Sequence, residues 1–325
     1  MKKVLIYLIL TISVILFSAE KLVVYTYDSF VSGIGKEIVP IFEKMYGCKV
    51  ELLSFGDAGT VLSRLMLEKN NPKADVIVGL DQALLIRAIE NDLVQKFKPE
   101  NLSLLKYPEL YNEYGTPYDF GAIAIVYNKE KIKNPPKSFN DLLKDEFRGK
   151  IVVQDPRTSS TGLSFLLWTI AAFNEKYLDF WSKFKDNLLT ITPGWDEAFE
   201  MLESGEADIM VSYATDGAYS YYYYGDVKYV PVILDEGAFV QVEYASLVKN
   251  AKNEELAKKF IEFLLSDDFQ EKVPLNQWML PVTNVNLPEA FKYVPEIKKV
   301  LEIKEDIYMN QERILKEWAK EVIGG

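Results

Sequence analysis

Three aromatic side chains between residues 192 and 224 have the spacing of a ligand site. Trp195 follows a Thr-Pro-Gly turn and begins a series of apolar residues at helical spacing, so we expect it at a helix start. Residues 208–211 form a short apolar segment typical of a buried strand, and Tyr213 and Tyr219 follow its carboxyl end. Open α/β sheets bind their ligands beyond the carboxyl ends of strands. Aromatic faces grouped there predict a flat or cationic ligand.

Polar and aromatic loops also follow the predicted strands in the first part of the chain. Residues 21–25, 49–53 and 74–80 are apolar and β-prone, and amphipathic helical patterns separate them. Such a βαβαβ series with short connections is typical of a parallel sheet. The loops at the predicted strand and helix ends contribute the candidate ligand-binding residues Tyr27, Asp28, Asp57, Ala58, Gly59, Asp81, Ser159, Trp195, Tyr213 and Tyr219, and an irregular apolar loop contributes Trp278.

Each of these candidates has an ordinary structural explanation when it is taken alone. Asp57 is more often a turn or helix-capping residue than a ligand contact, and Asp81 can form a local turn. Trp195 or Trp278 can simply fill a core. The site hypothesis depends on the whole set, because predicted strand ends from both halves of the chain carry rings, carboxylates and hydroxyls. These groups suit a planar cation, since rings stack on it, carboxylates balance its charge and hydroxyls orient it.

Two long apolar stretches, residues 118–127 and 239–248, are β-prone and far apart in the sequence. We interpret them as a pair of strands that cross between two domains of similar construction. The first takes the chain into the second domain, and the other returns it to the first. The predicted organisation is a signal peptide at 1–19, a first lobe formed by 20–119 plus 241–284, and a second lobe formed by 120–240 plus 285–325.

The composition restricts both the location and the chemistry of the protein. Lys2 and Lys3 precede an uncharged apolar run at residues 4–17, which is typical of a secretory signal, with a membrane anchor as the alternative. Cleavage after Ala19 removes both lysines and changes the formal net charge from −11 to −13, so nucleic acid is not an expected partner. Histidine is absent and Cys48 is the only cysteine, which excludes histidine-based catalysis and an intrachain disulfide.

Several segments together resemble the thiamine-binding proteins of bacterial ABC transporters. They include VVYTYDSF, PKADVIVGLD, VVQDPRTSSTGL, LLTITPGWDEAF, DIMVSYATDGAY and NQWMLPVTNVNLP, and they run in order from about Val23 to Pro288. The resemblance implies an α/β fold of the two-lobed type II periplasmic binding proteins, which also include ferric-ion binders. Each lobe would be a central mixed sheet flanked by helices, and two crossing strands would join the lobes. Thiamine, together with its phosphates, would bind in the cleft between them.

The resemblance also implies roles for individual residues. By the family's motif, five aromatic positions surround the ligand rings, and three polar positions lie at the ligand, including its phosphate-bearing end. The aromatic positions are Tyr27, Trp195, Tyr213, Tyr219 and Trp278, and the polar positions are Asp57, Gly59 and Ser159. The chain departs from the family shortly after Phe30, where Val-Ser-Gly-Ile-Gly stands in place of a segment with a Trp. This departure bears on how the protein would hold a phosphate group, and therefore on its preference between thiamine and its phosphates.

The resemblance implies a periplasmic transport receptor without catalytic activity, cofactor or metal, which we expect to be a monomer. Such a receptor delivers its ligand to a membrane permease whose ATPase is a separate chain. The sequence accordingly has no G-x-x-x-x-G-K-[ST] loop with which to bind ATP itself.

Three other functions are compatible with parts of the sequence. A ferric-ion receptor could use tyrosinate oxygens from Tyr219 and residues 221–224, but it has no use for the two tryptophans. A polyamine receptor needs carboxylates at both ends of its ligand. A hydrolase could use Asp28 and Asp57 as paired carboxylates, although nothing in their spacing demands it. The thiamine receptor is therefore the preferred hypothesis.

Overall fold

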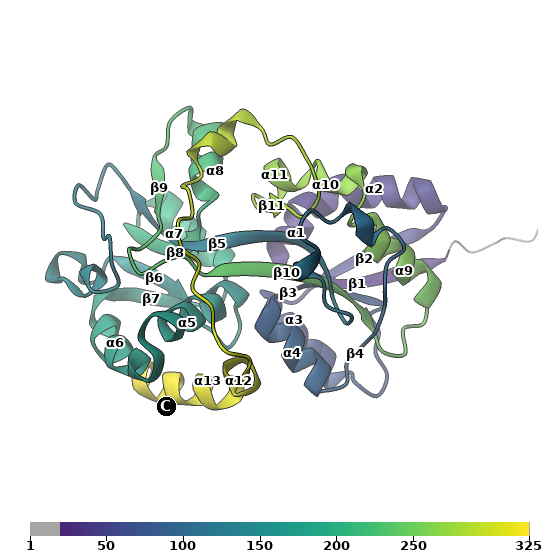
Figure 1. The fold of residues 1–325 in the computed structure, drawn as a ribbon, viewed down its shortest axis with the longest axis horizontal. Helices are drawn as coiled ribbons and strands as arrows, with labels where there is room; N and C mark the ends of the chain where they lie inside the picture. The colour runs from purple at the N-terminus through teal and green to yellow at the C-terminus, as the bar shows by residue number, and fades with distance from the viewer. Residues whose placement is uncertain (1–19, 325) are drawn as a thin grey trace, which may run out of the picture.

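The computed structural model describes residues 20–324, which fold into two lobes connected by a pair of long strands (Figure 1). The predicted signal peptide, residues 1–19, lies outside this range. Among residues 20–324, no helix combines the length and the apolar character that a membrane crossing requires.

The first lobe contains the predicted parallel strands in the order β2-β1-β3. Their bounds are β1 (Lys21–Thr26), β2 (Lys49–Ser54) and β3 (Val76–Leu80). All residues of β3 are buried, as expected for a parallel strand that helices cover on both faces. The helices of this lobe include α1 (Asp28–Ser32), α2 (Ile34–Tyr46), α3 (Ala58–Leu67), α4 (Gln82–Glu90) and, from late in the chain, α9 (Glu254–Phe263).

The second lobe is built around a sheet that contains β6 (Ile151–Gln154), β7 (Leu188–Thr192) and β8 (Ile209–Tyr213). β6 lies between β7 and β8 and is parallel to both. The helices of this lobe include α5 (Ser160–Phe173), α6 (Tyr177–Phe184), α7 (Trp195–Ser204) and α8 (Asp216–Tyr224). Three of them, α5, α7 and α8, follow the carboxyl ends of β6, β7 and β8 after short loops, so their amino-terminal ends gather at one edge of the sheet.

The long strands β5 (Thr116–Asn128) and β10 (Val240–Val248) agree closely with the two crossing strands that the sequence predicts (Figure 1). The first part of β5 pairs with β10, which in turn pairs with β3 of the first lobe. The second part, from Ile123 onward, pairs with β8 and with β9 (Tyr229–Val232) of the second lobe. β5 therefore belongs to both sheets and joins the lobes. The residue boundaries proposed for the lobes stay a prediction.

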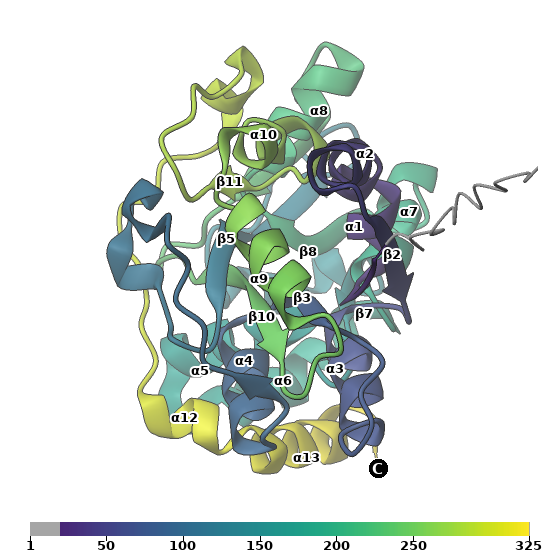
Figure 2. The same cartoon turned by 90° about the vertical axis from the view of Figure 1, so that its right-hand side faces the viewer.

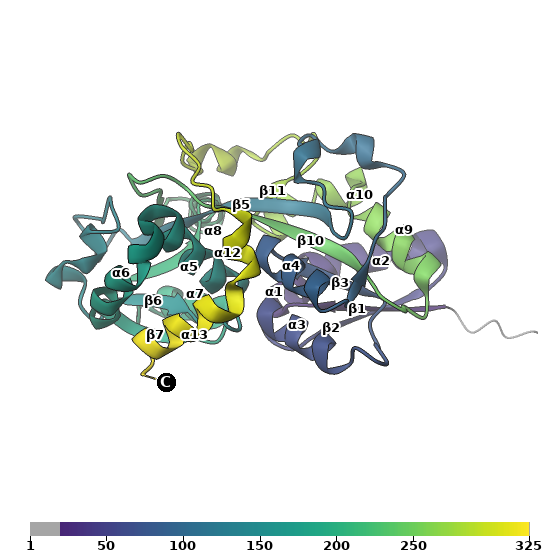
Figure 3. The same cartoon turned by 60° about the horizontal axis from the view of Figure 1, so that its bottom comes forward.

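The carboxyl-terminal helices contact both lobes on the side away from α8 (Figure 2, Figure 3). α13 (Gln311–Val322) packs on α6, where Trp318 lies edge-on to Trp181 with ring centroids 5.6 Å apart. α12 (Glu305–Met309) instead contacts α4 of the first lobe, and the Gln311 side chain donates a hydrogen bond of 2.5 Å to the Ala83 carbonyl oxygen. The tail therefore spans the junction between the lobes.

The remaining elements are short. They are β4 (Val94–Gln95), α10 (Asp267–Gln270), α11 (Val273–Asn276), β11 (Leu280–Pro281) and seven 3₁₀ turns among residues 20–324, at Leu102–Leu104, Pro108–Leu110, Asp141–Leu143, Asp145–Phe147, Asn174–Lys176, Lys185–Asn187 and Glu289–Tyr293. The segment between α11 and β11 brings Trp278 and Gln277 to the gap between the lobes.

The contact between α13 and α6 makes a prediction about stability. Trp318 is fully buried, so Trp318→Ala leaves a cavity and should lower the free energy of unfolding by about 3–5 kcal/mol. Trp318→Phe keeps most of the packing and should lower the free energy of unfolding much less. Urea denaturation followed by circular dichroism measures both variants. A loss below about 1 kcal/mol for the alanine variant would show that this contact does not hold α13 in place.

Candidate functional site

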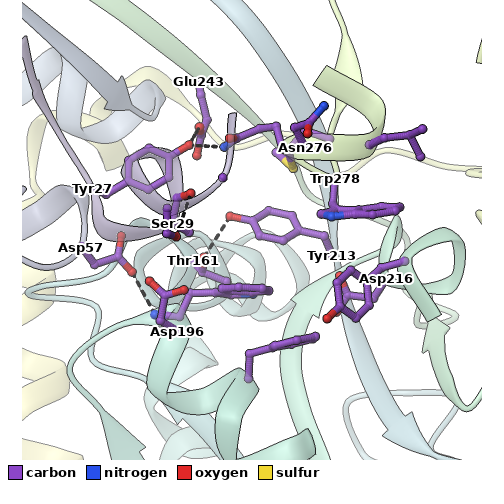
Figure 4. Close-up of a pocket in the computed structure, with 18 of the residues that line it drawn as sticks. Tyr27, Ser29, Asp57, Thr161, Asp196, Tyr213, Asp216, Glu243, Asn276 and Trp278 are labelled. Carbon is purple, nitrogen blue, oxygen red and sulfur yellow. Dashed lines mark hydrogen bonds between the residues drawn. The ribbon is translucent and has the colours of Figure 1, made fainter. Parts of the chain in front are cut away.

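A cavity of ≈ 470 Å³ lies between the lobes, and segments from both of them line it (Figure 4). The first lobe contributes the start of α1, the loop before α3, and β10. The second lobe contributes the first turns of α5, α7 and α8 and the end of β8, and residues 275–279 complete the wall. The cavity thus lies at the carboxyl ends of strands in both sheets, which is where the sequence predicted a ligand site.

Aromatic rings form one wall of this cavity. Trp195, the first residue of α7, stacks on Phe199 one turn later, with ring centroids 4.6 Å apart and an interplanar angle of 15°. The indole nitrogen of Trp195 donates a hydrogen bond of 2.9 Å to the Ser212 hydroxyl, which fixes the ring. Tyr219 lies edge-on to Phe199 at 5.1 Å and to Trp278 at 5.1 Å. Side chains from α7, α8 and the late segment therefore form one continuous aromatic surface.

Asp57 connects the two lobes at the base of the cavity. It is the capping residue of α3 in the first lobe, and one carboxylate oxygen accepts a 2.6 Å hydrogen bond from the Ala58 N–H. The other oxygen accepts a 3.1 Å hydrogen bond from the Trp195 N–H at the start of α7. Burial raises the pKa of Asp57, while the Ser159 hydroxyl and the backbone N–H groups of Ala58, Trp195 and Ser160 act in the opposite direction.

A second buried carboxylate, that of Glu243 on β10, lies behind Tyr27. One oxygen of Glu243 accepts hydrogen bonds from the Tyr27 hydroxyl at 2.6 Å and the Tyr118 hydroxyl at 2.5 Å. The other accepts from the Gln241 side chain at 3.0 Å, and Gln241 also donates to the Tyr213 hydroxyl at 3.0 Å. Burial raises the pKa of Glu243 to about 7 in spite of these donors. The network holds the Tyr27 and Tyr213 rings at the cavity wall.

Asp216 and Asp196 place further carboxylates at the cavity, each in the first turn of a helix. Asp216 begins α8 and is only 3 % exposed, and its Oδ2 atom has no hydrogen-bond partner among the described residues. Burial raises the pKa of Asp216 to about 7 against the lowering effect of the Ser212 hydroxyl. The pKa of Asp196 rises to about 6 because of burial and then of the negative charges of Asp57 and Asp28. Carboxyl groups from both lobes therefore line the cavity.

Six of the predicted ligand-binding residues lie together on the cavity wall: Tyr27, Asp57, Trp195, Tyr213, Tyr219 and Trp278. The other five lie off the wall, and most of them have the structural roles that are usual for their residue types. Asp81 caps α4 by accepting from the Leu84 N–H at 2.7 Å, and Ser159 caps α5 by accepting from the Gly162 N–H at 3.2 Å. The ligand contacts of all of these residues stay predictions.

Asp28, Ala58 and Gly59 complete the group that lies off the wall. Asp28 is exposed at the start of α1, and Ala58 is buried in the core of the first lobe. Gly59 allows a close approach of the two lobes, since a Cβ atom at this position would lie 2.7 Å from the Thr158 carbonyl oxygen. The neighbouring Thr60 N–H donates to that same oxygen at 3.2 Å. Gly59 thus contributes to contact between the lobes.

Sequence reasoning missed several residues of the wall, among them Glu243, Asp216 and Asp196. A signal existed for Glu243, which is a carboxylate within an otherwise apolar predicted strand. A signal also existed for Asp216 and Asp196, because each lies in the first turn of a helix that follows a strand, as Trp195 does. Ser29 and Thr161 also line the cavity, and they had no comparable signal.

Two tyrosines of helix α8 share one carboxylate as their hydrogen-bond partner. The hydroxyls of Tyr219 and Tyr224 donate hydrogen bonds of 3.2 and 2.6 Å to the same Glu203 oxygen. Burial, together with the charge of Glu203, raises the pKa of both phenols and so opposes formation of the tyrosinates that bind iron. Within residues 20–324, no three histidine, cysteine or carboxylate side chains are grouped as metal ligands.

Comparison with known proteins gives matches over nearly the whole chain. Residues 71–310 match a family described as bacterial extracellular solute-binding protein. A thiamine-binding periplasmic protein of Salmonella typhimurium is 35% identical over 309 residues, which cover 94% of each chain. A solved structure of a periplasmic thiamin binding protein superimposes with a TM-score of 0.89, at 35% identity, over 94% of this chain and 96% of the other. The ferric binding protein from Campylobacter jejuni, at 24% identity and a TM-score of 0.78, shares the fold. The predicted two-lobed type II fold is confirmed.

The buried carboxylate of Asp216 makes a prediction about stability and pH. Its pKa is about 7 in the folded protein and close to 4 in an unfolded chain, so the folded state binds more protons between these values. Stability from this group is therefore lost as the pH rises through that window. Asp216→Asn should raise the free energy of unfolding by about 2–4 kcal/mol above pH ~7, and by much less near pH ~5.

The control for this prediction is Asp186→Asn, which removes an exposed carboxylate of the same lobe. It should change stability little at either pH, because an exposed charge loses little hydration on folding. Urea denaturation at the two pH values measures all three proteins. Equal stability of the wild type and Asp216→Asn at the higher pH would contradict a raised pKa of the buried Asp216 carboxyl group.

Proposed function

The chain belongs to the family of bacterial extracellular solute-binding proteins, and we propose that it is the receptor of an ABC importer that captures thiamine between its lobes. The observation that carries this proposal is the joint presence of an aromatic surface and buried carboxylates around one cavity. Its volume of ≈ 470 Å³ lies in the usual range for small-molecule sites. The relatives that are named as thiamine-binding periplasmic proteins support the choice of ligand.

The chemistry of thiamine matches both parts of the cavity. The ligand has two flat rings, of which the thiazolium carries a positive charge and the pyrimidine carries an amino group. A cationic ring held over an indole or phenol face gains about 2 kcal/mol or more when water is excluded. Trp195, supported by Phe199, offers such a face, and Tyr219 and Trp278 enclose it. Asp216 and Asp196 then balance the charge, and the free oxygen of Asp216 can accept from an N–H donor.

The two-lobed arrangement explains how the receptor works. The first lobe supplies Tyr27 and Asp57, while the second supplies Trp195, Tyr213 and Tyr219. A ligand held between them contacts both lobes, so binding favours the closed form. Closure also excludes water, which strengthens the electrostatic contacts of the cation. The protein performs no reaction; it acts in the periplasm and presents the ligand to a permease, and a separate ATPase drives transport.

Replacing the central ring tests the proposal directly. Trp195→Ala removes one desolvated ring contact and should weaken thiamine binding at least roughly tenfold in isothermal titration calorimetry. Trp195→Phe retains a flat face and should lose less affinity. The melting temperatures of the ligand-free variants serve as the control for folding. An unchanged dissociation constant for the alanine variant would refute the role of Trp195, and no detectable binding of thiamine to the wild type would refute the proposed function.

The raised pKa values of the cavity carboxylates predict a pH dependence of binding. Burial raises the pKa of Asp196 to about 6 and those of Asp216 and Glu243 to about 7. A bound cation favours the ionised carboxylates, so binding releases protons and the affinity for thiamine should fall as the pH is lowered from about 8 to about 6. Calorimetry in two buffers of different ionisation enthalpy measures the released protons. A constant affinity without proton release would show that these carboxylates do not respond to the ligand.

A further inference from the structure

We propose that the carboxyl-terminal segment, residues 299–322, is a strap that favours the closed arrangement of the lobes from outside the ligand cavity. This inference goes beyond the proposed function, because it concerns the equilibrium between open and closed lobes in the ligand-free protein. The strap runs on the side away from α8 and contributes no residue to the cavity wall (Figure 2, Figure 3). It contacts the second lobe near both of its ends and the first lobe between them.

The two ends of the strap are attached to the second lobe. At its start, the Leu301 N–H donates to the Ala238 carbonyl oxygen at 2.7 Å, and the Ala238 N–H donates to the Lys299 carbonyl oxygen at 2.8 Å. Ala238 belongs to a buried cluster of the second lobe. At the other end, α13 packs on α6, and the Lys185 ammonium group donates to the Glu321 carbonyl oxygen at 2.8 Å. Both ends therefore move with the second lobe.

The middle of the strap is attached to the first lobe at the start of α4. The Gln311 side chain, which is only 3% exposed, donates to the carbonyl oxygen of Ala83 in the first turn of α4. α12 contacts α4 as well. Burial, and then the negative charge of Asp81, raise the pKa of the Tyr308 phenol, which places this α12 side chain near the residue that caps α4. One segment thus contacts both lobes.

The contact between the strap and the first lobe is small enough to be made and broken. The bond from Gln311 to Ala83 is the only hydrogen bond between them among residues 20–324. The Oε1 atom of Gln311 is buried without a partner in the same part of the chain, which offsets some of the stabilisation. A cavity of ≈ 480 Å³ lies beside the contact, lined by the end of α4 and by strap residues between 309 and 317. The first lobe therefore has room to move relative to the strap.

The strap contacts α4 in a conformation in which the lobes also touch at the ligand cavity. There, Asp57 accepts the Trp195 N–H at 3.1 Å, and the Thr60 N–H donates to the Thr158 carbonyl oxygen at 3.2 Å. These contacts define the closed arrangement, and opening separates them. Opening also moves α4 relative to the strap, because the ends of the strap stay with the second lobe. The bond from Gln311 therefore adds to the stability of the closed form and shifts the equilibrium toward it.

Gln311→Leu tests the inference, since it keeps the approximate size of the side chain and removes the hydrogen bond to Ala83. Spin labels at Lys69→Cys on the first lobe and Glu206→Cys on the second, both exposed positions, report the distance between the lobes. Cys48→Ala in the background prevents labelling of the natural cysteine. In double electron–electron resonance of the ligand-free protein, we expect the ratio of closed to open form to fall at least about threefold, as for the loss of one buried hydrogen bond.

A second variant and a matched control make the outcome specific. Tyr308→Ala removes another side chain of the same contact and should shift the ratio in the same direction. Tyr177→Phe removes a 3.0 Å hydrogen bond from α6 to Glu317 of the strap, within the second lobe, and should leave the ratio unchanged. An unchanged ratio in both Gln311→Leu and Tyr308→Ala, or a shift toward the closed form in either, would overturn the inference.

The rate of ligand release gives a second readout. A ligand between the lobes leaves only after they open, so thiamine should dissociate at least about threefold faster from Gln311→Leu than from the wild type in stopped-flow tryptophan fluorescence. Equal dissociation rates would contradict the strap. If the wild type fails to bind thiamine, the proposed function alone fails, because the distances in the ligand-free protein still decide whether the strap acts.

Discussion

The contact between Asp57 and the first residue of α7 is the interaction on which the site depends. Asp57 caps α3 in the first lobe, and its second oxygen accepts the Trp195 N–H in the other lobe. The same hydrogen bond therefore fixes the distance between the lobes and the start of the helix that carries the central ring. Trp195 is held again at its indole nitrogen by Ser212 of the same lobe, so its side chain is positioned independently of the contact with Asp57. Such preorganisation lowers the entropic cost of binding.

Much of the fold and part of the site could be predicted from the sequence, because both follow from short-range patterns. The alternation of strand and helix patterns predicted the order of the elements. Open α/β sheets bind their ligands at the carboxyl ends of strands, and this predicted that Tyr213 and Tyr219 lie at the site. The same local patterns could not separate a ligand contact from a helix cap. Asp57 and Asp81 both cap helices that follow strands, but only Asp57 reaches the other lobe. That difference depends on the position of one lobe relative to the other, which local sequence patterns do not predict.

The missed carboxylates have a related explanation. A charged residue within an apolar strand, such as Glu243, is tolerated only where other segments supply its hydrogen bonds. Its donors, Tyr27, Tyr118 and Gln241, come from β10 itself and from segments more than a hundred residues away. The tail is similar, since no local pattern around α13 shows that Gln311 bonds to the first lobe. An opening motion of the lobes must break or shift that hydrogen bond as well as the one at Asp57.

The cavity holds its carboxylates at a cost, and this cost is what makes it selective for a cation. Asp216 and Glu243 are buried with raised pKa values, so their ionised forms are unfavourable until a positive charge arrives. A neutral ligand with the same rings would stack on Trp195 but would leave the free oxygen of Asp216 unpaired. A cation without rings would satisfy the carboxylates but would leave the aromatic wall without a flat partner. Only a ligand that is both flat and positive satisfies both parts of the cavity, and the two lobes must be closed for it to do so.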